Sequence, residues 1–210
     1  RSHRPQQTSF KTHKTMLKDI PSHVANCPFC KGNEDSTPPS LFTLPNTSLR
    51  VIPNKFPAVD PLLSGKNLHH HPHQHQHHHY HHDEVLNPVM PAVGFHEVVV
   101  ESENHNAHVA VGGNAHSYNL LKAFRERGRA HREVGEDGGE EALKIEHTIF
   151  FKNHGGIAGA SLIHPHSQII SVPVVPIFAK LLHENALSYF QRMRENLYKR
   201  VVEEELDVFR

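Results

Sequence analysis

The sequence predicts an α+β fold, in which an antiparallel sheet is flanked by helices. The strand-like and helix-like segments do not alternate as regular βαβ units, which argues against a parallel sheet. With 210 residues, 37% of them hydrophobic, the chain is long enough to bury a core. No apolar run approaches the roughly 18–20 residues of a membrane span, so we expect no membrane partner.

The individual elements follow from hydrophobic period and β-branched content. Runs rich in valine, isoleucine and phenylalanine predict strands over 49–53, 95–101, 145–151 and 160–172. An apolar stripe of Tyr118, Leu121 and Phe124 predicts a helix over 117–133. Residues 177–206 have the composition of one long helix. We therefore divide the chain into a domain over 1–176 and a long C-terminal helix within 177–210.

The charge balance limits the classes of partner. Lys and Arg number 22, as do Asp and Glu, so the formal net charge is zero. A chain without a basic excess lacks the driving force for coating nucleic acid, and we expect no nucleic-acid partner. The N-terminus lacks the pattern of a signal peptide. Because the chain starts at Arg1 rather than Met, we interpret it as a fragment or a processed form.

Histidine is unusually frequent, with 23 residues, and ten of them lie in the tract 69–82. Such a low-complexity run can bind metal loosely. The interpretation that we favour is a disordered insertion within a long loop, outside any catalytic site.

The only two cysteines, Cys27 and Cys30, stand two residues apart in a Cys-Pro-Phe-Cys run. This spacing is a poor disulfide framework and a good half of a metal site. It also favours a reducing compartment, and we expect a cytoplasmic protein.

The most informative stretch is residues 150–170. On a strand, His164, His166 and Gln168 would point to one face, where three polar side chains need partners. The preceding turn over 153–159 contains three glycines, which allow backbone N–H groups to approach a phosphate. A histidine can attack phosphorus when an acceptor, such as a backbone carbonyl, holds its other ring nitrogen.

This stretch resembles the active-site strand of the galactose-1-phosphate uridylyltransferase family, the transferase branch of the histidine-triad superfamily. Relatives that are hydrolases carry a third histidine where this chain has Gln168. The resemblance implies a histidine-triad-like half-fold with two catalytic residues. His166 would be the nucleophile that takes the nucleotidyl group, and Gln168 would hydrogen-bond a phosphate oxygen.

The resemblance also implies a zinc ion as cofactor. Cys27 and Cys30 match the family's cysteine pair, His105 its third ligand and His164 its fourth. Two thiolates and two imidazoles form a complete tetrahedral set for a closed structural zinc. Two neighbouring histidines, His96 and His108, are alternative candidates for the third ligand.

Substrate-binding residues follow from softer matches to the same family. An Arg-x-x-Arg-Pro run places arginines on nucleotide phosphates, an Asn-x-Phe-Pro run lines the nucleoside pocket, and the glycine-rich turn and its surroundings bind phosphate. The residues concerned are Arg1, Arg4, Asn54, Phe56, Asn153, Gly159 and Ser161.

Three hypotheses of function follow. The first is uridylyl transfer from UDP-glucose to galactose 1-phosphate through a nucleotidyl-histidine, in galactose metabolism. The second is an ADP-glucose phosphorylase with the same chemistry. Ser167 is compatible with this alternative, because many uridylyltransferases carry glycine at that position. The third is an inactive zinc-binding half, because the resemblance covers only the family's first half. The implied partners are a nucleotide sugar, a sugar phosphate and, for a full-length protein, a second copy in a homodimer.

Overall fold

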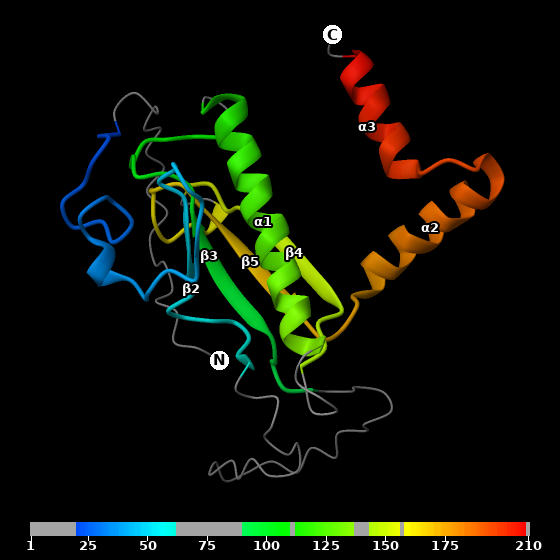
Figure 1. The fold of residues 1–210 in the computed structure, drawn as a ribbon, viewed down its shortest axis with the longest axis horizontal. Helices are drawn as coiled ribbons and strands as arrows, with labels where there is room; N and C mark the ends of the chain where they lie inside the picture. The colour runs from blue at the N-terminus through cyan, green and yellow to red at the C-terminus, as the bar shows by residue number, and fades with distance from the viewer. Residues whose placement is uncertain (1–19, 62–89, 110–111, 137–142, 156–157, 209–210) are drawn as a thin grey trace. The chain divides into compact units, whose positions relative to one another are not determined.

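The computed structural model describes residues 20–61, 90–109, 112–136, 143–155 and 158–208, which form parts of two compact units (Figure 1). The first unit ends at Pro173 and contains the sheet and its helix. The second begins at Val174 and contains two helices. Arg1, Arg4 and the histidine-rich tract 69–82 lie outside the described residues.

Five strands form one sheet in the order β1-β2-β3-β5-β4, and every neighbouring pair is antiparallel. This architecture confirms the α+β prediction. The long β3 and β5 lie at its centre, paired from Phe95 with Ser171 to Val100 with His166. The strands are β1 (Phe42–Thr43), β2 (Arg50–Pro53), β3 (Phe95–Val100), β4 (His147–Phe151) and β5 (His166–Val172), and a 3₁₀ turn spans Glu34–Ser36.

The two faces of the sheet bury different sets of side chains because residues alternate along a strand. On one face, Val51, Val99 and Ile169 pack against the helix α1 (Gly113–Glu136). On the opposite face, Ile52, Val98 and Val100 pack together with Phe29. By the same alternation, His166 and Gln168 of β5 share this second face, since they pair with Val100 and Val98.

Helix α1 covers the sheet with a different stripe from the one expected. Tyr118 and Leu121 are each 65% exposed, whereas Leu120 and Ala123 are buried against the sheet. Of the predicted stripe, Phe124 does pack against the core, and the rest of the buried face continues into polar residues at helical spacing. Hydrophobicity alone therefore identified only part of the buried side of the helix.

The polar part of this stripe is a buried ion-pair network. Arg127 of α1 donates two hydrogen bonds to Glu97 of β3, at 2.9 and 2.5 Å. His131 lies 2.8 Å from the same carboxylate and 2.7 Å from the Ser171 hydroxyl. Burial alone would raise the pKa of Glu97, but the hydrogen bonds from Arg127 and His131 outweigh it and hold that pKa below its ordinary value.

Replacing Glu97 by glutamine is expected to destabilise the fold by about 3 kcal/mol at pH 7, because it leaves the Arg127 charge buried without its partner. A carboxylate whose pKa is lowered by folding stabilises the fold above its unfolded pKa, and this contribution is lost as the pH falls through the folded pKa. The difference between the two proteins should therefore shrink below about pH 4. Urea unfolding of the wild type and the variant, at pH 7 and below about pH 4, measures this difference in the free energy of unfolding. Glu133→Gln, on an exposed position of α1, is the control. An equal difference at both pH values would contradict this assignment.

Strand β5 begins at His166, six residues later than the predicted strand over 160–172. Residues before it form turns, with Gly159 at φ +81°, a conformation that favours glycine. Pro165 has no backbone N–H to donate to a ladder, although its carbonyl accepts from Glu101 N at 3.3 Å. His164 therefore precedes the strand, so the expected alternation of polar side chains along one strand face applies only to His166 and Gln168.

The second unit contains two helices, so the single helix predicted over 177–206 was wrong. α2 (Ile177–Met193) ends at Arg194, which has φ 57° and whose N–H caps the Phe190 carbonyl at 2.8 Å. α3 (Leu197–Val208) begins after Asn196, whose side-chain oxygen accepts the Lys199 N–H at 3.1 Å. Neither helix has a buried residue.

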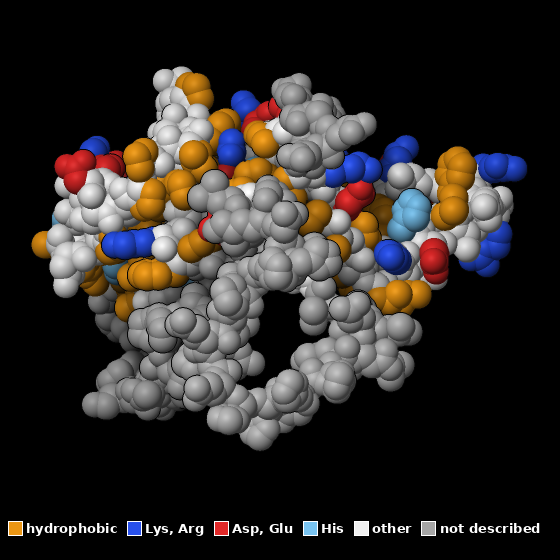
Figure 2. Space-filling model, turned by 90° about the horizontal axis from the view of Figure 1, so that it is seen from below, with side chains coloured by type: hydrophobic (Ala, Val, Ile, Leu, Met, Phe, Trp, Pro, Cys, Tyr) orange, Lys and Arg blue, Asp and Glu red, His pale blue; other side chains and the backbone are white. Residues whose placement is uncertain are grey.

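The surface carries both kinds of charge. Figure 2 shows acidic and basic side chains interspersed with hydrophobic ones on the described part of one face. Within the described ranges, the helices all fall short of the length and apolarity that crossing a membrane would require.

Candidate active site and metal centre

Four side chains from three segments that are distant along the chain lie close together. The nearest ligand atoms of Cys27, Cys30, His105 and His164 all lie within 4.8 Å of one another, and all four residues are buried. These are the four metal ligands expected from the sequence. His105 and His164 lie 75 and 134 residues after Cys30 along the chain. The cluster therefore joins the N-terminal turn to the segments after β3 and before β5.

Local backbone bonds shape the cysteine turn. Cys30 N donates to the Cys27 carbonyl at 3.2 Å, and the amide of Asn33 donates to the same carbonyl at 2.8 Å. Val24 N approaches Cys30 Sγ at 3.4 Å, as a donor would approach a thiolate. The His105 N–H bonds the Ser22 carbonyl at 2.7 Å, which ties the third ligand to the same turn.

The donor set fits a tetrahedral zinc ion. Cys30 Sγ lies 3.4 Å from His105 Nδ1 and 3.6 Å from His164 Nδ1. Zinc bonds of about 2.3 Å to sulfur and 2.0–2.1 Å to nitrogen at tetrahedral angles place such atoms about 3.6 Å apart. Two thiolates also favour zinc over magnesium or calcium.

The protonation of the ligands supports the same conclusion. His164 Nε2 lies 2.8 Å from the Ser102 carbonyl, which only accepts, so Nε2 carries the proton and Nδ1 keeps its lone pair. Burial lowers the pKa of His164 to about 4, so the ring is neutral near pH 7. Burial raises the pKa of the Cys30 thiol, and a bound cation is what would make its thiolate stable there.

Neither alternative third ligand joins the cluster. The ring of His108 stacks edge-on against His154, with centroids 4.7 Å apart. His96 lies on β3, where it bonds Gln168. Of the three candidates, only His105 is in the cluster.

The side chain of His166 is oriented by the backbone of a metal-cluster residue. Its Nδ1 lies 2.9 Å from the His164 carbonyl, and the residue is 8% exposed. A carbonyl only accepts, so Nδ1 carries the proton, and Nε2 of the neutral ring has the free lone pair. This is the backbone acceptor that the sequence led us to expect. Phe29 packs beside the same ring, with centroids 5.5 Å apart.

Gln168 lies two residues further along the same face of β5. Its side-chain oxygen is 2.8 Å from His96 Nε2. The same His96 nitrogen is 2.9 Å from the Asn54 amide nitrogen. Gln168, predicted as catalytic, and Asn54, predicted as substrate-binding, are thus both in contact with His96, which we expected only as an alternative zinc ligand.

The glycine-rich loop between β4 and β5 is held at both ends by one buried carboxylate. Glu101 accepts hydrogen bonds from Lys152, at 2.6 Å, and from the Ser167 hydroxyl. Within this loop, Asn153 is partly buried, whereas Gly159 and Ser161 are exposed. Sequence reasoning missed Glu101. The available signal was a carboxylate that directly follows an apolar strand.

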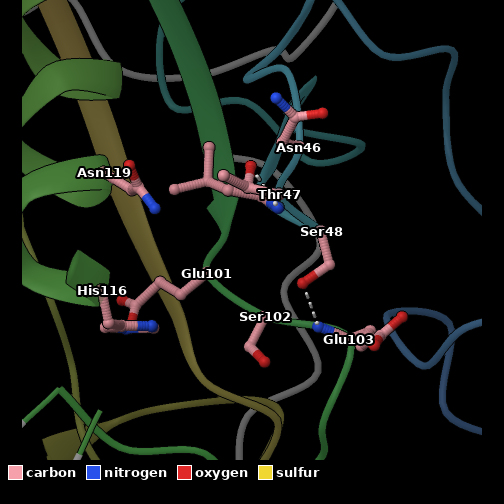
Figure 3. A pocket seen from close by; sticks show the side chains of 9 residues that line it. Asn46, Thr47, Ser48, Glu101, Ser102, Glu103, His116 and Asn119 are labelled. Carbon is pink, nitrogen blue, oxygen red and sulfur yellow. Dashed lines mark hydrogen bonds and ion pairs between the residues drawn. The ribbon is translucent and has the colours of Figure 1, made fainter. Parts of the chain in front are cut away.

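A polar cavity of about 620 Å³ lies beside Glu101, on the α1 side of the sheet (Figure 3). The figure shows the side chains of Glu101 and His116 next to each other, and the Ser48 hydroxyl accepting the Glu103 N–H. His116 Nε2 lies 3.6 Å from Glu101 Oε2. His166 and Gln168 are not among its lining residues. We therefore assign the candidate active site to the opposite face, where these two side chains lie.

Phe56 is less enclosed than a residue of a preformed pocket, with 55% of its surface exposed. Its N–H bonds the Asn54 side-chain oxygen at 2.9 Å, so the Asn-x-Phe-Pro run forms a compact turn. Arg1 and Arg4 lie outside the described residues, and their assignment remains a prediction.

Known proteins match this chain over most of its length. A domain family described as "Domain of unknown function (DUF4931) N-terminal domain" matches residues 88–175. An ADP-glucose phosphorylase of Arabidopsis thaliana is 30% identical over 195 residues, covering 91% of this chain and 49% of that protein.

Solved structures agree with the sequence match. A crystal structure of an ADP-glucose phosphorylase from Arabidopsis thaliana with bound ADP-glucose superposes with a TM-score of 0.61 and 28% identity, covering 84% of this chain and 48% of that chain. A uridylyltransferase structure superposes with a TM-score of 0.54 and 26% identity, covering 88% of this chain and 51% of that chain. The chain thus spans about half the length of the relatives that it matches. It is homologous to members of the galactose-1-phosphate uridylyltransferase branch of the histidine-triad superfamily, with its similarity consistent with their N-terminal half.

Proposed function

We propose that this chain carries the nucleotidyl-transfer centre of a nucleotide-sugar enzyme, with His166 as its nucleophile. The observation that carries the proposal is the hydrogen bond from His166 Nδ1 to the His164 carbonyl. It leaves the Nε2 lone pair available for attack on phosphorus. His164 is itself held in the metal cluster, so the nucleophile is oriented by a rigid part of the fold.

The reaction has two steps, each a nucleophilic substitution at the same phosphorus atom. His166 Nε2 attacks the α-phosphorus of the nucleotide sugar and forms an N–P bond. The P–O bond to the second phosphate breaks, and sugar 1-phosphate leaves with the electron pair. In the second step an oxygen of an acceptor phosphate attacks the same phosphorus and releases His166. Throughout, the His164 carbonyl stabilises the positive charge that the ring acquires.

The other residues of this face fit supporting roles. Gln168 would donate an amide hydrogen to a non-bridging phosphate oxygen, and the 153–161 loop, with Asn153, Gly159 and Ser161, would receive the phosphates. Asn54 and Phe56 would contact the nucleoside, and Arg1 and Arg4 the phosphates. Zinc on Cys27, Cys30, His105 and His164 supplies structural rigidity and no step of the reaction.

Two donors are compatible with this centre. UDP-glucose with galactose 1-phosphate as acceptor would place the protein in galactose metabolism. ADP-glucose with inorganic phosphate is favoured by the 30% identity to an ADP-glucose phosphorylase. Ser167 would not contact the base of either donor, because its hydroxyl donates to Glu101 on the α1 side of the sheet, opposite to His166. It therefore does not distinguish ADP-glucose from UDP-glucose. We further propose a cytoplasmic homodimer for the full-length protein, without nucleic-acid or membrane partners.

The test is the mass of the intact protein after brief mixing with ADP-glucose or, in parallel, UDP-glucose. An adenylyl adduct alone is expected from a phosphorylase, and a uridylyl adduct alone from a uridylyltransferase. Each adduct should disappear on addition of the matching acceptor, inorganic phosphate or galactose 1-phosphate. A folded, zinc-bound chain that forms neither adduct would contradict the proposal and support a non-catalytic zinc-binding half.

A further inference from the structure

His96 is a buried histidine on the active-site face, outside the metal cluster and without a role in the mechanism above. It lies on β3, directly beside β5, and is 5% exposed. Both ring nitrogens make contacts. The Ala58 N–H donates to Nδ1 at 2.9 Å, and Nε2 lies 2.8 Å from Gln168 Oε1.

These contacts determine which ring nitrogen carries the proton. A backbone N–H has a fixed direction and only donates, so the Nδ1 that receives the Ala58 N–H keeps its lone pair. The neutral ring then carries its proton on Nε2. That proton is donated to the oxygen of Gln168.

The Asn54 amide nitrogen, 2.9 Å from the same Nε2, offers a competing arrangement in which Nε2 would accept. A neutral ring that accepted there would carry its proton on Nδ1, against the Ala58 N–H. The amide of Asn54 cannot turn round without losing the bond from the Phe56 N–H to its oxygen, at 2.9 Å. Each amide oxygen therefore accepts a hydrogen bond: that of Asn54 from the Phe56 N–H, and that of Gln168 from His96 Nε2.

We propose that His96 is a positioning residue that sets the orientation of the Gln168 amide. The oxygen and nitrogen of an amide lie at opposite sides of one planar group, so fixing the oxygen fixes the nitrogen. Among the described residues, the nitrogen of Gln168 makes no hydrogen bond of its own. It is thus presented as a donor on the face that carries His166, and Asn54 presents a second amide donor beside it.

This inference rests on the proposed function, because a fixed donor matters where an anionic phosphate oxygen has to be bound. Charge on the non-bridging oxygens during transfer needs donors, whereas a flipped Gln168 would direct a carbonyl oxygen at them. A single histidine tautomer therefore decides whether Gln168 assists the reaction or opposes it. His96 would act on the rate of nucleotidyl transfer rather than on the capture of the nucleotide.

Two conservative variants separate this role from a purely structural one. The amide nitrogen of glutamine reaches the position of a histidine Nε2, and the amide of asparagine reaches that of Nδ1. His96→Gln keeps the donor to Gln168, whereas His96→Asn keeps only the group that faces Ala58. We expect the rate of adduct formation to stay within about 3-fold of wild type in His96→Gln and to fall about 10- to 100-fold in His96→Asn, with unchanged nucleotide affinity. If the ring served only to accept the Ala58 N–H, His96→Asn would keep the wild-type rate and His96→Gln would lose it. That result would overturn the proposal.

Three further measurements complete the test in the 210-residue chain. The first combines His96→Asn with Gln168→Ala, where the histidine change should add less than about 2-fold, because both act through one amide. The second uses His183→Gln, at an exposed position of α2, as control, with the rate expected unchanged. The third is the ¹⁵N NMR spectrum of the wild-type histidines, in which the His96 proton should lie on Nε2. A proton on Nδ1 would overturn the proposal whatever the activity. His166→Gly tests the proposed function separately, since an adduct that persists there contradicts His166 as the nucleophile and leaves the tautomer of His96 to be decided by NMR.

Discussion

Replacing Cys30 by serine is expected to release the metal and to lower the midpoint of thermal unfolding by about 10 °C. Cys30 is fully buried and lies within ligand distance of both histidines of the cluster, at 3.4 and 3.6 Å. Binding energy at a structural zinc site is folding energy, because the site does not exist in the unfolded chain. A loss of about 4 kcal/mol corresponds to this shift for a chain of 210 residues.

A matched pair of histidines makes the same test specific. His105→Asn should also lose zinc, whereas His108→Asn, three residues later, should keep about one ion per chain. Metal analysis after dialysis and a thermal melt of each variant provide the measurements. Zinc retained by His105→Asn and lost by His108→Asn would show that the third ligand has been assigned to the wrong histidine.

Replacing His166 by glycine is expected to reduce the rate of nucleotidyl-adduct formation by about 10³-fold or more, the scale seen when a nucleophile is removed. The ring is the group on this face whose free nitrogen is oriented by the His164 carbonyl. Glycine removes the nucleophile without adding a side chain to the site. Zinc content should be unchanged, because His166 is not a member of the four-residue cluster.

The control for this variant is His183→Ala, which changes an exposed histidine outside the first unit. It should form the adduct at the wild-type rate. The comparison is made by quenching the reaction at short times and measuring the modified fraction. Adduct formation by His166→Gly at the wild-type rate would exclude His166 as the nucleophile.

Sequence reasoning was sufficient for the features that depend on short-range pattern. The Cys27–Cys30 spacing, together with the resemblance, gave all four residues of the metal cluster. Antiparallel topology followed from strand and helix order. The need for a backbone acceptor on His166 followed from the chemistry of histidine alone, and the structure supplies it.

Features that depend on long-range pairing were not accessible in this way. The buried face of α1 includes Arg127 and His131, whose burial makes sense only once Glu97 is placed opposite them. The break before α3 depends on a left-handed Arg194, a conformation that nothing in the residue type demands. From the sequence, His96 was a rival zinc ligand. Its hydrogen bond to Gln168 could not be foreseen, because it depends on the register that pairs His96 with Ile170 and Val98 with Gln168.

The position of the nucleotidyl group on the trapped adduct tests most directly whether His166 is the nucleophile. The chain is mixed with ADP-glucose or UDP-glucose, digested near neutral pH to preserve the N–P bond, and the peptide containing His164 and His166 is fragmented in the mass spectrometer. We expect the whole nucleotidyl group on His166 and none on His164, whose side chain belongs to the metal cluster. Modification of His164, or of a residue outside this peptide, would contradict it.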